Sequence, residues 1–69
     1  RNGGMGTLKI GDKVYVGGRG RTEVVTGIKL PEGRKEEMDW ADVSRGGRFI
    51  TLELEDGTKV KANMISRWD

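Results

Sequence analysis

The chain has 69 residues and a net charge of +2, from 13 Lys and Arg against 11 Asp and Glu. This length indicates one small domain with a thin hydrophobic core. The chain contains neither Cys nor His, which excludes disulfides, thiolate metal sites and Ser–His or Cys–His catalysis. No apolar run reaches the roughly 20 residues of a membrane span. We therefore expect a cytoplasmic, non-enzymatic protein without a membrane partner, cofactor or bound metal.

The charges are unevenly distributed along the chain. Residues 1–29 hold six basic and two acidic residues, a balance of +4, and residues 30–44 hold two basic and five acidic residues, a balance of −3. Residues 45–69 hold five basic and four acidic residues, a balance of +1. This pattern predicts separate basic and acidic faces.

The first predicted elements are a lead-in and a strand. Residues 1–6 contain three glycines and are expected to be a disordered lead-in or the remnant of a tag, so the single domain spans residues 7–69. From Leu8 to Val16 the sequence alternates as a strand does. Ile10, Val14 and Val16 share the inward parity, and Lys13 and Tyr15 share the outward one.

A hairpin is predicted next. The glycines of residues 17–20 favour a tight turn, and a second strand follows from about Arg21 to Leu30. Val24, Thr26 and Ile28 are expected on one face and Glu23, Val25 and Gly27 on the other. Gly27 inside the run predicts a bulge or a close backbone approach.

Residues Pro31 to Gly47 carry no long apolar stripe. Pro31 and Gly33 end the strand, and the segment is interpreted either as a long solvated loop or as a loop with one helical turn around Met38 and Ala41. The sequence does not decide between these two interpretations.

Two further hairpin strands and a short final strand complete the pattern. Ile50, Leu52 and Leu54 alternate with polar residues in a strand over Arg48–Glu55, and Asp56-Gly57 predicts a type I′ turn. The chain returns over residues 58–62 with Val60 inward, so that Glu53 and Glu55 lie across from Lys59 and Lys61. Residues 63–65 form a break, and Ser66-Arg67-Trp68 form the final strand.

Five short antiparallel strands in about 60 residues suit a closed barrel, because closure removes exposed sheet edges. The runs Ile10-Gly11-Asp12-Lys13-Val14-Tyr15-Val16 and Val60-Lys61-Ala62-Asn63-Met64-Ile65-Ser66-Arg67-Trp68 resemble the first and last strands of SH3-like small barrels of the KOW and Tudor-like kind. The resemblance covers residues 8–68. It implies an all-β, five-stranded SH3-like barrel with a long loop or short helical turn between strands two and three.

Two basic glycine-rich segments are the first candidate site. They are Gly17-Gly18-Arg19-Gly20-Arg21 and Ser44-Arg45-Gly46-Gly47-Arg48. Glycine lets a phosphate approach the backbone, and Arg offers a planar fork of donors. The alternative is that both segments are ordinary turns in which Arg serves solubility.

Exposed aromatic residues beside cations are the second candidate. Tyr15 and Phe49 have outward parity near Lys13 and Arg48, where they can stack on bases. The alternative places aromatic side chains over the core, and we favour that alternative for Trp40 and Trp68. The predicted nucleic-acid contacts are Lys13, Tyr15, Arg19, Arg21, Arg45, Arg48, Phe49, Lys59 and Lys61.

An aromatic residue inside an acidic segment is the third candidate. Such segments can hold basic peptides, and here the residues are Glu36, Glu37, Asp39, Trp40 and Asp42. A solvated loop is the alternative. The sequence thus favours a small nucleic-acid-binding accessory domain. A protein-interaction module that uses the Trp40 segment or a barrel face, of the kind a phage or mobile element could encode, is the second hypothesis.

Overall fold

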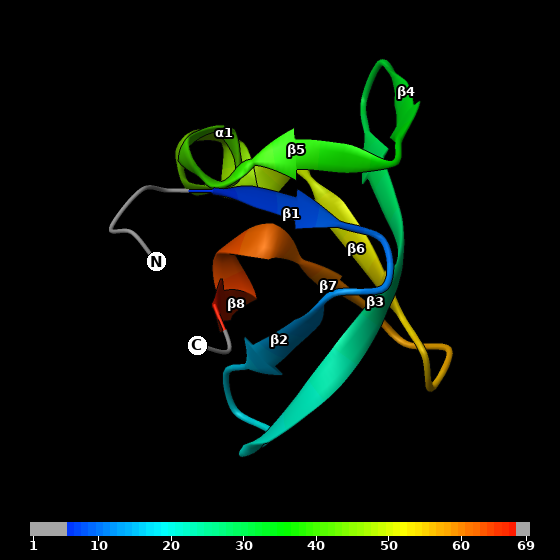
Figure 1. Ribbon diagram of the computed structural model, residues 1–69, viewed down its shortest axis with the longest axis vertical. Helices are drawn as coiled ribbons and strands as arrows, with labels where there is room; N and C mark the ends of the chain where they lie inside the picture. The colour runs from blue at the N-terminus through cyan, green and yellow to red at the C-terminus, as the bar shows by residue number, and fades with distance from the viewer. Residues whose placement is uncertain (1–5, 68–69) are drawn as a thin grey trace.

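A computed structural model describes residues 6–67, which form a mostly β domain with one short helix (Figure 1). The predicted lead-in, apart from Gly6, and the predicted strand residue Trp68 lie outside the described residues. The elements in chain order are β1 (Thr7–Lys9), β2 (Lys13–Val16), β3 (Arg21–Leu30), β4 (Gly33–Lys35), β5 (Glu37–Asp39), α1 (Trp40–Gly46), the 3₁₀ turn η1 (Gly47–Phe49), β6 (Thr51–Leu54), β7 (Lys59–Lys61), the 3₁₀ turn η2 (Ala62–Met64) and β8 (Ile65–Arg67).

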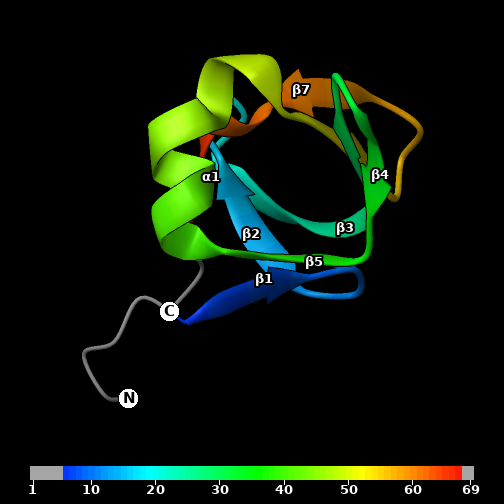
Figure 2. The ribbon, with the colours of Figure 1, turned by 90° about the horizontal axis from the view of Figure 1, so that it is seen from above.

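All strand pairs are antiparallel and fall into two sheets. One sheet is β1 with β5, which lie side by side in Figures 1 and 2. The other has the order β7-β6-β3-β2-β8, and β4 also pairs with β3. Within residues 6–67 no pairing joins β7 to β8, so the sheets are not closed and the predicted five-stranded barrel is not confirmed.

The first predicted strand is in fact two strands. Val14 and Val16 are buried and Lys13 and Tyr15 are exposed, as the alternation predicted. Ile10, however, is 44% exposed, and the fully buried residue is Leu8. The chain turns here because Gly11 adopts a φ of +98° and the Asp12 carboxylate accepts a 2.9 Å hydrogen bond from the Lys9 amide.

The long strand β3 has the predicted bounds and the predicted irregularity at Gly27. Its register shifts between Val25 and Gly27, so the parity of buried residues changes along the strand. Val25 and Ile28 are both buried, whereas Thr26 is exposed. The prediction that Thr26 and Ile28 share a face is therefore wrong, because it assumed unbroken alternation.

The segment after β3 is ordered structure rather than a loop. β4 returns along β3, β5 pairs with β1, and α1 follows directly. Met38, Trp40 and Val43 are buried and fix this segment to the core. A short helix is present, as the second interpretation predicted, but it begins at Trp40, so that it includes Ala41 and leaves Met38 in β5.

The β6–β7 hairpin differs from the predicted type I′ turn. That turn needs positive φ at both central residues, and among the described residues only glycines, including Gly57, have positive φ. The Leu54 amide bonds to the Thr58 carbonyl at 2.9 Å, which leaves three residues in the loop. Glu53 faces Lys59 as predicted, but Lys61 faces Thr51 instead of Glu55.

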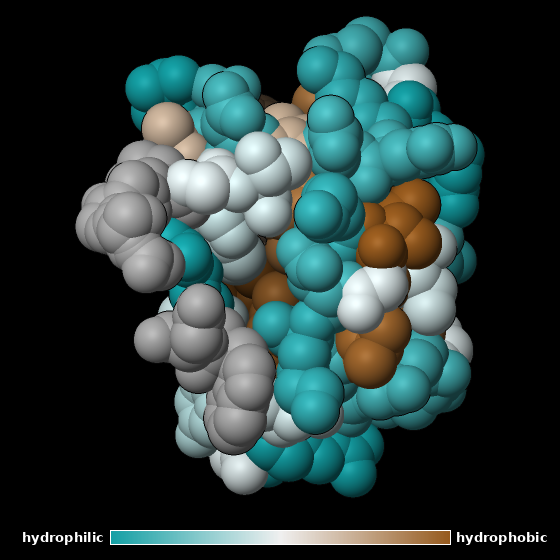
Figure 3. Space-filling view, viewed as in Figure 1, coloured by the Kyte–Doolittle hydropathy of each residue, from teal (hydrophilic) through white to brown (hydrophobic). Residues whose placement is uncertain are grey.

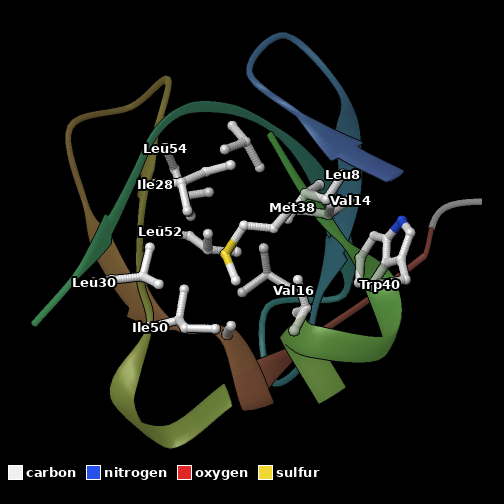
Figure 4. Close-up of a cluster of buried hydrophobic side chains, with 13 residues drawn as sticks. Leu8, Val14, Val16, Ile28, Leu30, Met38, Trp40, Ile50, Leu52 and Leu54 are labelled. Carbon is white, nitrogen blue, oxygen red and sulfur yellow. The ribbon is translucent and has the colours of Figure 1, made fainter. Parts of the chain in front are cut away.

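One hydrophobic core lies between the two sheets and α1 (Figure 4). It joins strand residues such as Leu8, Val14 and Leu52 to Met38 and Trp40 from the β5–α1 segment. Val60 and Ala62 complete the end near η2, where a break and a final strand occur as predicted but begin one residue earlier, so that Ile65 belongs to β8 and not to the break. No helix in residues 6–67 has the length and apolar character needed to cross a membrane.

Candidate nucleic-acid interface

The outer face of β4, β3, β6 and β7 carries a row of cations. The Cα partners across these strands are Arg34 and Lys29, then Lys29 and Thr51, then Thr51 and Lys61. The Lys61 ammonium donates a 3.1 Å hydrogen bond to the Thr51 hydroxyl, which places both side chains on one face. Side chains alternate between faces, so the neighbouring row of Ile28, Leu52 and Val60 turns inward to the core.

A second row lies beside the first and contains an acidic side chain, Glu53. Gly27 pairs with Glu53, and Glu53 pairs with Lys59. The Arg34 guanidinium reaches diagonally to Glu53 and donates two hydrogen bonds to its carboxylate, at 3.1 and 2.5 Å. We name Lys29, Arg34, Thr51, Glu53, Lys59 and Lys61 the basic strip, whose four cations and one anion give +3.

The strip contains only part of the surface predicted from sequence. Lys59 and Lys61 belong to it, whereas sequence reasoning missed Lys29 and Arg34. The register of β3 shifts at Gly27. Side-chain alternation counted from the start of the strand therefore does not show on which face Lys29 lies. Arg34 joins the surface through β4, a strand in a segment interpreted as a loop.

Two other predicted contacts, Arg19 and Arg21, take part in an ion-pair network at the opposite end of β3. Arg19 lies 2.8 Å from the Asp56 carboxylate, and the Arg21 Nε lies 2.8 Å from Glu23, which is 4% exposed. The Thr58 hydroxyl and amide donate to Asp56 at 2.6 and 3.0 Å. These bonds, with Arg19, lower the pKa of Asp56 from 3.8 to about 2. Both guanidiniums thus have internal carboxylate partners.

Lys13 and Tyr15 lie on β2, separated from β6 and β7 by β3. Tyr15 is 40% exposed and faces Thr22 on one side and Ser66 on the other. The structure therefore does not place this aromatic ring beside Lys59 and Lys61. A base stacked on Tyr15 would have to belong to a ligand that extends across the sheet.

Arg45, Arg48 and Phe49 lie on α1 and η1. Arg45 pairs with Asp42, and the Arg48 guanidinium lies over the Phe49 ring at 4.8 Å. Phe49 is 57% exposed and helps to line a cavity of about 400 Å³ together with Leu30, Pro31, Glu32, Lys35, Met38, Asp42, Gly46 and Ile50. Figure 2 looks onto this end, with α1 and β4 on opposite sides.

The acidic segment keeps its carboxylates at the surface but not its aromatic ring. Glu36, Glu37, Asp39 and Asp42 are exposed. Trp40 is buried, as the alternative interpretation of this residue predicted, and its ring lies 6.0 Å from the Arg67 guanidinium. The indole is therefore unavailable for stacking on a peptide.

The face shown in Figure 3 is mainly hydrophilic, with small apolar patches over β3 and the turn between β1 and β2. Within the described part of the chain, no group of three or more acidic side chains is arranged to hold a metal ion. The surface thus offers charge and hydrogen-bond donors.

No family model matches this chain, and neither the curated proteins nor the solved structures contain a match.

Proposed function

We propose that this domain binds the phosphate backbone of nucleic acid through the basic strip. The row Arg34, Lys29, Thr51 and Lys61 carries the proposal, because three cations and a hydroxyl share one exposed sheet face. Neighbouring strands lie about 4.8 Å apart, so Lys29 and Lys61 are separated by roughly 10 Å at the backbone. That span suits an extended chain of phosphates better than one small anion.

Binding of this kind is expected to be independent of base sequence. The strip offers ammonium and guanidinium donors, which contact phosphates, and contains no aromatic ring on which a base could stack. Tyr15 lies on a separate strand, and Arg19 and Arg21 have internal partners. Electrostatic attraction therefore supplies most of the expected affinity.

The finer fold assignment is also our proposal: the domain is a member of the SH3-like small barrels. The order of β7, η2 and β8 supports it, since this resembles the strand, 3₁₀ turn and strand at the end of such barrels. Nuclear Overhauser contacts between strands that close the open sheet would support the assignment. Rapid exchange of the amides of β7 and β8 that do not pair with β6 or β2 would contradict it.

Two double variants test the nucleic-acid proposal. Lys29→Glu with Lys61→Glu alters the strip, whereas Lys9→Glu with Lys13→Glu alters β1 and β2, and both change the net charge from +2 to −2. We expect the strip variant to lower affinity for a single-stranded oligonucleotide about tenfold more than its control. Equal losses would place the site elsewhere, and no binding by the unaltered protein at low salt would refute the proposal.

Binding of a protein segment is a second candidate, and the cavity beside Phe49 is the observation that favours it. Its lining joins apolar side chains to the carboxylate of Glu32, to the ammonium of Lys35 and to Asp42, whose carboxylate also pairs with Arg45. This composition suits an apolar side chain next to a Lys or Arg.

We expect the peptide acetyl-Lys-Phe-Lys-amide to shift the amide resonances of Gly46 and Phe49, and acetyl-Glu-Phe-Glu-amide to do so less. Phe49→Ala should abolish the shifts, whereas Tyr15→Ala, on a distant strand, should not. Equal shifts with both peptides would contradict the role of the carboxylates. Absence of shifts at Gly46 and Phe49 would exclude this candidate.

A further inference from the structure

Within the basic strip, the Glu53 carboxylate occupies the position in which an external anion would meet Arg34. The guanidinium holds both carboxylate oxygens, at 3.1 and 2.5 Å, through the parallel pair of bonds that Arg also forms with phosphate. Lys59 is the Cα partner of Glu53 on its other side. An anion at this point therefore meets the fork of guanidinium donors over β6, whose neighbouring strand β7 carries Lys59.

The backbone makes room for this arrangement at Gly27. A Cβ atom at this residue would overlap with the Glu53 carboxylate and would come within 3.2 Å of the Arg34 guanidinium. The absence of a side chain lets the acid and the guanidinium lie low over the sheet. The anion position is therefore built into the register of β3 and β6.

There is also space beside Arg34. This residue helps to line a cavity of about 280 Å³ together with Ile10, Thr26, Gly27, Ile28, Lys35 and Glu36. Two cations and the Thr26 residue border this cavity, with Glu36 as its one acidic residue. The Arg34 side chain is 56% exposed, so a phosphate group can approach it from solvent.

We infer that Arg34 forms a phosphate subsite that Glu53 occupies in the free protein, so that nucleic acid displaces the Glu53 carboxylate. This inference rests on the proposed function. The Glu53 carboxylate accepts from both terminal nitrogens of Arg34, so a phosphate that binds this same fork of donors must take its place. Glu53 then competes with the ligand for the Arg34 guanidinium. This competition weakens binding and disfavours ligands that carry only one negative charge.

The test compares Glu53→Gln with Glu37→Gln, which removes the same charge from an exposed residue on β5. We expect Glu53→Gln to raise affinity for a single-stranded oligonucleotide at least threefold more than Glu37→Gln. Adding Arg34→Ala to Glu53→Gln should remove the gain, because the freed guanidinium is its source. Unchanged thermal melting of each variant would exclude altered folding.

Inorganic pyrophosphate provides an arm that needs no nucleic acid. We expect it to shift the side-chain Nε–H resonance of Arg34, and to do so at lower concentration in Glu53→Gln. Equal effects of the two Gln variants, or an Arg34 resonance that pyrophosphate leaves unmoved, would overturn the inference while oligonucleotide binding upholds the proposed function. Failure of the unaltered protein to bind any oligonucleotide would refute the function, whereas the pyrophosphate result would still decide the subsite.

Discussion

Single residues decide how the first part of the chain meets the core. Leu8 and Ile10 share a parity and a similar size, yet Leu8 is fully buried and Ile10 is 44% exposed. Leu8 lies in β1, whereas Ile10 lies in the turn between β1 and β2, next to Gly11. The two side chains therefore do not belong to one continuous strand. Parity alone therefore cannot rank their contributions to stability.

We expect Leu8→Ala to lower the free energy of unfolding by about 2–5 kcal/mol, because it leaves a cavity under β1 and β5. Ile10→Ala should cost less than about 1 kcal/mol, since much of its side chain already contacts water. Urea unfolding of both variants measures the difference. Equal losses would mean that β1 is placed wrongly.

Asp56 links the stability of the β6–β7 hairpin to pH. Its folded-state pKa is about 2, below the ordinary value of 3.8, chiefly because the Thr58 hydroxyl and amide donate to the carboxylate. Folding thus favours the deprotonated form. The stabilisation is complete above about pH 4 and is lost as pH falls towards 2.

Thermal melting between about pH 5 and pH 2 checks this dependence. We expect the unaltered protein to lose stability in the lower part of this range, and Asp56→Asn to be less stable at neutral pH with a weaker loss on acidification. Parallel pH profiles for the two proteins would show that the Asp56 carboxylate does not contribute.

At the scale of elements, the two 3₁₀ turns are packed backbone against backbone. A Cβ on Gly47 in η1 would lie 2.9 Å from the Asn63 nitrogen and 3.1 Å from its Cα in η2. The neighbouring Gly46 has ordinary space, since its nearest neighbour, the Ile50 Cδ1, lies 3.7 Å away. Neither of these adjacent glycines has a positive φ. They therefore differ in the space that is available for a Cβ atom.

Gly47→Ala should destabilise the domain by about 1–3 kcal/mol, because backbone atoms of η2 must move to admit the methyl group. Gly46→Ala should be neutral or should stabilise by up to about 1 kcal/mol, since Ala loses less entropy on folding. Denaturant unfolding of the two variants provides the comparison. A neutral Gly47→Ala would contradict the close approach of η1 and η2.

At the scale of the whole molecule, charge is sorted by the order of strands in the sheet. Arg19 and Arg21 at one end of β3 are matched by Glu23 and Asp56. The other end of β3 lies between β4 and β6, where the basic strip has a balance of +3. The strip thus gives one part of the outer face of the sheet a net positive charge.

Salt dependence measures how many phosphates the strip contacts. Three contacts, from Lys29, Arg34 and Lys61, predict a slope of about −2 in log affinity against log salt for a single-stranded oligonucleotide. Lys61→Glu should reduce the magnitude of this slope by about 0.7, the share of one phosphate. An unchanged slope in this variant would show that Lys61 contacts no phosphate.

The sequence by itself determined the local elements with their own signals. Alternation located β2, β3 and β6, the glycines located the turns around residues 17–20 and 57, and Gly27 indicated the bulge. These features follow from side-chain alternation and backbone freedom over a few residues. The same reasoning predicted the outward orientation of Lys59 and Lys61, which lie exposed on a short, regular strand.

Only the tertiary structure decided features that join distant residues. β5 is a strand because β1, some thirty residues earlier, pairs with it, and Trp40 and Met38 then pack into a core that no local pattern defines. The register shift at Gly27 sets the face of Lys29, and the β3–β4 pairing brings Arg34 to Glu53. The basic strip is therefore a property of strand order and register, which local sequence does not encode.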